Sequence, residues 1–247
     1  MLRNLGLEER LHVLHNNYRM HGLQQTLRDV LGAWLGRPLT DHFDRKYGVE
    51  TAHGVPTDNA GIADQGLRAN AVRYSAIAEP VMRHFLREVT PDIGVADYTF
   101  IDLGCGKGRA LIMASELPFR EVIGVELSPA HCATARENWQ RARANLRYQP
   151  RCERVSVHCV SASEFEFPAE PLLIYMFRPF FGPVFRQVLD RLSETKDRFG
   201  KPVWIGLCHP QEEFVLQQHP RFILRREHQV IAENHSWNLW ECLPAAH

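Results

Sequence analysis

The chain has 247 residues with 29 basic and 29 acidic side chains, so its formal net charge is zero. Hydrophobic residues make up 45% of the sequence, which is enough to bury a core in one or two domains and too much for a disordered chain. Balanced charge also argues against a protein that binds nucleic acid mainly by neutralising phosphates. The six cysteines form no CxxC pair and no zinc-like grouping, which predicts no metal site and reduced thiols in a cytoplasmic protein. No apolar run reaches the roughly 18 residues of a membrane span, so we expect no membrane partner.

Residues 1–73 are predicted to form a helical and loop-rich N-terminal extension. Apolar residues recur at helical spacing from Leu7 to Leu35, and Pro38 marks a stop. Between residues 40 and 73 this pattern gives way to Gly, Asp and Asn, which is typical of long connections that serve as lids or binding loops. We expect this extension to select the substrate, to cap the site or to pair with another subunit.

Residues 74–247 show the alternation of an α/β domain. A helix is predicted over 81–89. The strands expected in a parallel sheet lie at 99–103, 122–127, 155–160, 172–177 and 203–208, with helices at 109–116, 129–144 and 183–192. After a short helix at 212–217, strands at 222–232 and 236–243 have no helix between them and predict an antiparallel hairpin at the sheet edge. The predicted fold is a doubly wound, mostly parallel, seven-stranded sheet.

A glycine loop follows the first of these strands. Gly104, Gly106 and Gly108 alternate before a helix that starts at Arg109, so backbone N–H groups face whatever lies over the loop. The dinucleotide fingerprint GxGxxG would place its third glycine where this chain has Arg109. Asp102, just ahead of the loop, would repel a pyrophosphate and suits a ligand that carries an ammonium or sulfonium group.

Glu126 ends the second strand, about 20 residues beyond the loop. An acidic residue at this point is placed to accept hydrogen bonds from ribose hydroxyls. Asp102 and Glu126 together therefore indicate a nucleoside with a cationic, amino-acid-like tail, a description that fits S-adenosyl-L-methionine.

The run DLGCGKGR followed by GVELSP resembles the first two motifs of the class I S-adenosylmethionine-dependent methyltransferases, and the resemblance covers about residues 74–243. It implies a seven-stranded Rossmann-like sheet in which Asp102 contacts the methionine amino group and Glu126 holds the ribose. Such enzymes often have an Asp near the adenine after strand three, where this chain has Ser161 and Ala162, so a hydroxyl or backbone group would serve there. The cofactor-binding set that it implies is Asp102, Gly104, Cys105, Gly106, Glu126, Leu127, Ser161 and Ala162.

Tyr74 stands just before the helix that precedes strand one. The stretch RYSAIAEPV is similar to the tyrosine-led loop, YxPTP in its usual form, of non-SET lysine methyltransferases and their bacterial relatives. This likeness implies that Tyr74 covers the cofactor. The Pro-Thr-Pro core is absent here, and the alternative is a tyrosine that packs against the start of the helix.

Three residues, Tyr74, Arg178 and His209, form the predicted catalytic set. Arg178 follows the fourth strand, where methyltransferases that act on amino groups of DNA bases or of glutamine carry Asn or Asp. A guanidinium there can hold a substrate carboxylate or phosphate in bidentate fashion, or it can simply face solvent. His209 ends strand five and is the first candidate for a general base, ahead of His235 in the hairpin turn.

The favoured function is therefore methyl transfer to a protein side chain, such as a lysine amine, or to a small metabolite, with nucleic acid disfavoured. Two alternatives stay open at this point. One is a nucleotide-dependent oxidoreductase on a Rossmann-like sheet, against which Arg109 and Asp102 both count. The other is a non-catalytic protein that binds S-adenosylmethionine.

Overall fold

The computed structural model describes residues 42–52, 74–178, 180–208, 213–228 and 236–245. The chain divides into two units, residues 1–46 and 47–247. The described part of the first unit is residues 42–46, which belong to α2 (His42–Tyr47). The helices predicted over residues 1–36 and the connection at 53–73 lie outside the described residues.

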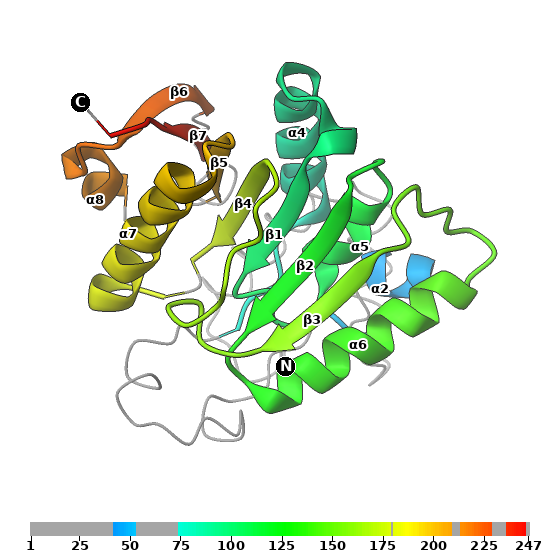
Figure 1. Ribbon diagram of the computed structural model, residues 1–247. Coiled ribbons are helices and arrows are strands. Elements are labelled where there is room, and N and C mark those ends of the chain that lie inside the picture. Colours follow the sequence, from blue (N-terminus) through cyan, green and yellow to red (C-terminus); the bar gives the residue numbers. More distant parts are fainter. Residues whose placement is uncertain (1–41, 53–73, 179, 209–212, 229–235, 246–247) are drawn as a thin grey trace, which may run out of the picture. The chain divides into compact units, whose positions relative to one another are not determined.

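A seven-stranded sheet runs through the described part of the second unit, in the order β3-β2-β1-β4-β5-β7-β6 (Figure 1). The first five strands are parallel, and β7 is antiparallel to both of its neighbours. Both the mostly parallel sheet and its closing hairpin are thereby confirmed. The strands are β1 (Thr99–Leu103), β2 (Glu121–Glu126), β3 (Val155–Cys159), β4 (Leu172–Phe177), β5 (Val203–Cys208), β6 (Phe222–His228) and β7 (Trp237–Cys242).

The helices of this unit are α4 (Glu79–Val89), α5 (Arg109–Ser115), α6 (Pro129–Ala144), α7 (Gly182–Phe199) and α8 (Glu213–Gln218), with 3-10 turns η3 (Thr90–Asp92) and η4 (Val95–Asp97). Among the described residues, no helix combines the length and the apolar character that a transmembrane span needs. The predicted helices agree with these bounds to within about two residues, except for α7.

Helix α7 extends seven residues beyond the predicted end at Leu192, so that prediction was wrong. The apolar spacing stops at Leu192 because the last two turns are largely polar and exposed. The helix continues as far as Gly200, which takes a left-handed φ of 67° and donates its N–H to the Lys196 carbonyl. Glycine is the usual residue for such a cap.

Each face of the sheet is covered by helices. Phe185, Val188 and Leu192 of α7 pack in one apolar core with Ile101 of β1 and Ile174 of β4. On the opposite face, α4 packs so closely that its Phe85 ring fills the space beside Gly206 of β5. Because both faces are buried, the inner strands β1, β4 and β5 are apolar almost throughout, whereas the edge strand β3 is partly exposed and carries Ser156 and His158.

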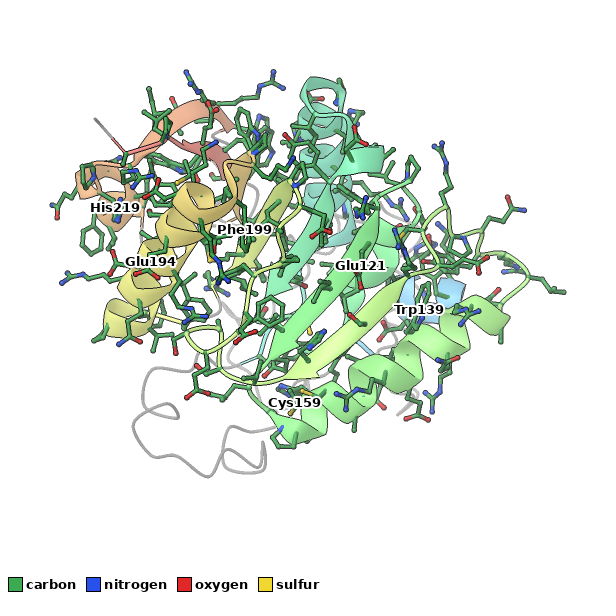
Figure 2. The ribbon with its side chains drawn as sticks, in the orientation of Figure 1. Glu121, Trp139, Cys159, Glu194, Phe199 and His219 are labelled. Carbon is green, nitrogen blue, oxygen red and sulfur yellow. The ribbon has the colours of Figure 1, made fainter. Side chains whose placement is uncertain are left out.

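The strand order reverses at β1, because the chain builds outward from β1 through β2 and β3 and then from β4 through β5. Ligands of doubly wound sheets bind outside the carboxyl ends of the strands at this point. The glycine loop follows β1 and Arg178 follows β4, so both lie at this edge. Figure 2 labels Cys159, where β3 reaches the same edge, and Glu121 at the opposite end of β2.

We expect Gly206→Ala to lower the free energy of unfolding by about 1–3 kcal/mol, the usual cost of overpacking a core. A Cβ at Gly206 would lie 2.1 Å from Phe85 Cζ. Phe85 is fully buried with Tyr175 and Trp237 beside it, so it has little room to move. Urea denaturation measures the effect, with Gly94→Ala as the control because its Cβ would meet nothing closer than 3.6 Å. Equal stabilities of the two variants would contradict this account of α4 packing.

Candidate active site

The Glu126 carboxylate links the glycine loop to the start of α6. Its Oε2 accepts the Gly106 N–H at 2.9 Å, and its Oε1 accepts the Ser128 N–H at 2.8 Å. The Glu126 side chain keeps 12% of its surface exposed. An ionised carboxylate offers about four lone-pair positions, so two acceptor positions remain for ligand hydroxyls.

Asp102 carries a buried carboxylate that is not paired. It is the second-last residue of β1, and 3% of its surface is exposed. Within the described part of the chain no hydrogen bond or ion pair reaches its carboxylate. Burial raises the pKa of Asp102 well above its usual value, and the nearby charge of Glu126 raises it further. Such a group is stabilised by a cation that enters the site.

Tyr74 lies directly on the glycine loop. A Cβ on Gly106, which has a left-handed φ of 52°, would come within 2.2 Å of the Tyr74 ring, so only glycine fits beneath it. The Tyr74 hydroxyl donates to the Thr51 carbonyl at 2.5 Å, and its ring centroid lies 5.0 Å from that of His131. The structure thus brings Tyr74 to the residues predicted to line the methionine tail.

Residues 47–51, which we call the strap, bind to the same loop. The Lys107 ammonium pairs with Glu50 at 2.7 Å, and Arg109 Nε donates to Thr51 Oγ1 at 2.7 Å. The fully buried Asn138 amide exchanges hydrogen bonds with the Glu50 backbone and also donates to the Lys107 carbonyl. The strap is therefore bound to the glycine loop, to the start of α5 and to α6, through Glu50 and Thr51.

Arg178 adopts the one left-handed φ, 47°, among the non-glycine residues that the structure describes. Its guanidinium carbon lies 5.3 Å from the Phe177 ring centroid, and its buried Nε has no hydrogen-bond partner. Burial lowers the pKa of Arg178. Backbone strain of this kind costs on the order of 1–3 kcal/mol and clusters at functional sites. His209, the third predicted catalytic residue, lies outside the described residues.

Comparison with known proteins agrees with this geometry. Residues 100–193 match the family described as "Methyltransferase domain". The chain therefore contains a methyltransferase domain. Its cofactor is S-adenosylmethionine. No match was found among curated proteins.

Two solved structures share the fold of this methyltransferase. Magnesium protoporphyrin IX methyltransferase from Synechocystis PCC 6803, with bound S-adenosylmethionine, has 11% identity, covers 90% of this chain and 98% of its own, and gives a TM-score of 0.50. A protein from Pyrococcus horikoshii, proposed to be an RNA methyltransferase, has 17% identity, covers 74% of this chain and 92% of its own, and gives a TM-score of 0.51. At these identities the likeness concerns the fold.

The other predicted cofactor contacts of the methyltransferase surround Glu126. Gly104 is exposed at the loop, and its N–H and that of Cys105 donate to the Val125 carbonyl. The Cys105 thiol is buried beside Gly124 of β2, and this burial raises its pKa well above the usual value. Leu127 is half-buried.

The segment after β3 starts beside Glu126, because the Val160 N–H donates to the Glu126 carbonyl. Ala162 packs into the apolar core. The Ser161 hydroxyl lies 2.8 Å from that of Ser163 and so has a local partner. The roles predicted for Ser161 and Ala162 at the adenine stay predictions.

Sequence reasoning missed the strap and its partners. Arg109 was noticed only as a departure from the dinucleotide fingerprint, whereas its guanidinium is buried and binds Thr51 and the Ile77 carbonyl. The positions of Lys107 and Arg109 in a loop expected to be buried could have indicated such contacts, because buried cations need partners. Nothing in the sequence pointed to Glu50 and Thr51 as those partners.

The raised pKa of Asp102 predicts that cofactor binding releases a proton. The cofactor's ammonium favours the ionised form, so binding tightens as pH rises and becomes independent of pH above the pKa of the free protein. Calorimetry in buffers of different ionisation enthalpy, at the acidic end of the range in which the protein stays folded, measures this release. Asp102→Asn should bind more weakly and release no proton from this site. A binding heat that is independent of the buffer would contradict the assignment.

Proposed function

We propose that this methyltransferase binds S-adenosylmethionine between Asp102, Glu126 and the glycine loop, with Tyr74 covering the methionine tail. The observation that carries the proposal is the unpaired, buried carboxylate of Asp102 beside a second carboxylate. Two acidic side chains at one sheet edge disfavour a pyrophosphate. They suit a ligand with an ammonium at one position and ribose hydroxyls at the other.

We infer that the methyl acceptor is a nucleophile of a protein side chain, such as a lysine amine, or of a small metabolite, held outside the ends of β1 and β4. Bound S-adenosylmethionine supplies a methyl group on a sulfonium. For such an in-line displacement the protein must align the acceptor, exclude water and, for an amine, accept a proton. His209, at the end of β5 in the sequence, is our candidate for the proton acceptor.

The likeness of the Tyr74 segment to non-SET lysine methyltransferases supports an amine acceptor. The function proposed for the Pyrococcus horikoshii protein suggests RNA instead, but its likeness to this chain concerns the fold alone. The balanced charge of the chain gives no support to a phosphate-neutralising surface. We therefore propose a protein or small-molecule acceptor and make RNA an outcome of the test.

Substituting Glu126 tests the ribose contact. We expect Glu126→Gln to weaken S-adenosylmethionine binding by about ten-fold or more, because hydrogen bonds to a charged group contribute roughly 1.5–3 kcal/mol. Calorimetry with S-adenosylmethionine, S-adenosylhomocysteine and NAD measures the change. Glu121→Gln, at the opposite end of the same strand, is the control and should leave affinity unchanged. Unchanged affinity in Glu126→Gln would remove the ribose assignment, and tight binding of NAD alone would overturn the proposed function.

Tyr74 variants separate the ring from the hydroxyl. Tyr74→Phe keeps the ring over Gly106 and loses the bond to Thr51, whereas Tyr74→Ala loses both. If the ring covers the cofactor, Tyr74→Ala should raise the Kd for S-adenosylhomocysteine several-fold more than Tyr74→Phe does. Equal affinities of Tyr74→Ala and the unaltered protein would show that the tyrosine only packs against the loop.

The acceptor class can be sorted with radiolabelled S-adenosylmethionine and cell extract. Label should appear in a protein band that protease removes, or in a small molecule that passes a size filter. Label that nuclease removes would instead identify RNA or DNA as the acceptor. Heat-inactivated protein gives the background.

A further inference from the structure

The end of β4 carries a positive charge without a counterion. Among the described residues no carboxylate pairs with Arg178, and no hydrogen bond reaches its guanidinium. Most other arginines whose side chains meet the core do have partners, as Arg109 and Arg83 show. Leaving a partly buried cation unpaired costs free energy, so proteins usually pair such groups.

Two features hold Arg178 in this position. Its backbone has the left-handed φ of 47°, which turns the chain away from the direction of β4 directly after Phe177. Its guanidinium carbon lies 5.3 Å from the Phe177 ring centroid, within the range of a cation–π contact. A side chain that merely pointed into solvent would need neither feature.

The next element adds positive potential. Helix α7 begins at Gly182, four residues after Arg178, and its 18 residues align their peptide dipoles with the positive end at that start. No side chain caps this end and no acidic residue lies in the first turn. A Cβ at Gly182 would meet no atom of the described residues within 4 Å. Free N–H groups at a helix start and a guanidinium together favour an anion.

We propose that the methyl acceptor carries an oxyanion, a carboxylate or a phosphate, that Arg178 binds next to the methylated atom. This inference rests on the proposed function, because it places the acceptor at the crevice between β1 and β4. Arg178 thereby determines specificity by holding a group that does not react. The planar guanidinium fork can grip either oxyanion through two parallel hydrogen bonds.

The burial that lowers the pKa of Arg178 agrees with this role. Desolvation weakens the hold of water on the guanidinium, so a bound oxyanion regains interactions that the free protein lacks.

The test uses the full chain labelled with 15N and saturated with S-adenosylhomocysteine. Succinate and inorganic phosphate are the two probes, and choline chloride at equal ionic strength is the control. NMR follows the Nε–H signal of Arg178, which is assigned by its absence from Arg178→Lys. Arg198 gives a matched internal reference, because its guanidinium carbon also lies over an aromatic ring, 5.0 Å from the ring centroid of the adjacent Phe199. Phe199, which Figure 2 labels, is the last residue of α7, at the opposite end from Gly182.

We expect the Arg178 signal to shift and saturate with one or both anions, while the Arg198 signal does not saturate. Whichever anion acts at lower concentration identifies the carboxylate or the phosphate. Arg178→Gln should weaken anion binding by about ten-fold or more. Arg178→Lys keeps the charge without the guanidinium fork, so its affinity for the anion should lie between those of Arg178→Gln and the unaltered protein. Arg198→Gln should bind as the unaltered protein does.

Arg178 and Arg198 signals that respond alike to both anions would overturn the inference. So would a labelled small-molecule product from the extract experiment in which mass spectrometry finds neither a carboxylate nor a phosphate. In either case S-adenosylhomocysteine binding would still stand, so the proposed function would survive. Failure of the unaltered protein to bind S-adenosylhomocysteine would instead count against the proposed function.

Discussion

Two backbone N–H groups, those of Gly106 and Ser128, converge on the Glu126 carboxylate and join the glycine loop to the start of α6. This contact connects the ends of β1 and β2, which are neighbours in the sheet. The loop conformation, and with it the position of Asp102 just ahead of it, depends on this anchor. Because Glu126 is held by backbone groups, its orientation is set before any ligand arrives, which lowers the entropic cost of binding.

The same anchor creates an electrostatic conflict. It fixes one carboxylate close enough to Asp102 to raise the pKa of that second, buried carboxyl. Binding of a proton relieves this conflict, and under the proposed function the ammonium of S-adenosylmethionine would relieve it as well. Two carboxylates at one sheet edge disfavour a pyrophosphate, which supports the proposal that this loop of three glycines serves a methyltransferase and not a dinucleotide enzyme.

Periodicity predicted the strands that are buried on both faces and the helices that bury one face and expose the other. Strands β1 and β4 are buried on both faces, and α6 starts at a Ser-Pro cap, so their bounds were predicted closely. The last turns of α7 were missed because they bury little and so leave no apolar signal. The place of β7 between β5 and β6 could not be predicted, since the hairpin pattern fixes the pairing of two strands and not which of them joins the sheet.

The candidate site divides in the same way. Asp102, Gly106 and Glu126 were found because their spacing along two strands and a loop is local. The strap was not found, because its contacts join residues far apart in sequence through side chains that have no periodic pattern, such as Thr51 with Arg109. Pairing of that kind depends on how the chain returns to the sheet, which composition and spacing do not encode.

The strap also explains why Arg109 can replace the third glycine of the dinucleotide fingerprint. In dinucleotide enzymes that glycine allows the helix to approach the strand closely. Here the Arg109 side chain is buried and donates to Thr51 Oγ1 and to the Ile77 carbonyl, so it ties the segments before α4 to the loop. Tyr74 donates to the carbonyl of the same Thr51, and its ring lies on Gly106. Thr51 therefore binds both Tyr74 and Arg109, and through these two bonds it joins the glycine loop to the chain that precedes the sheet.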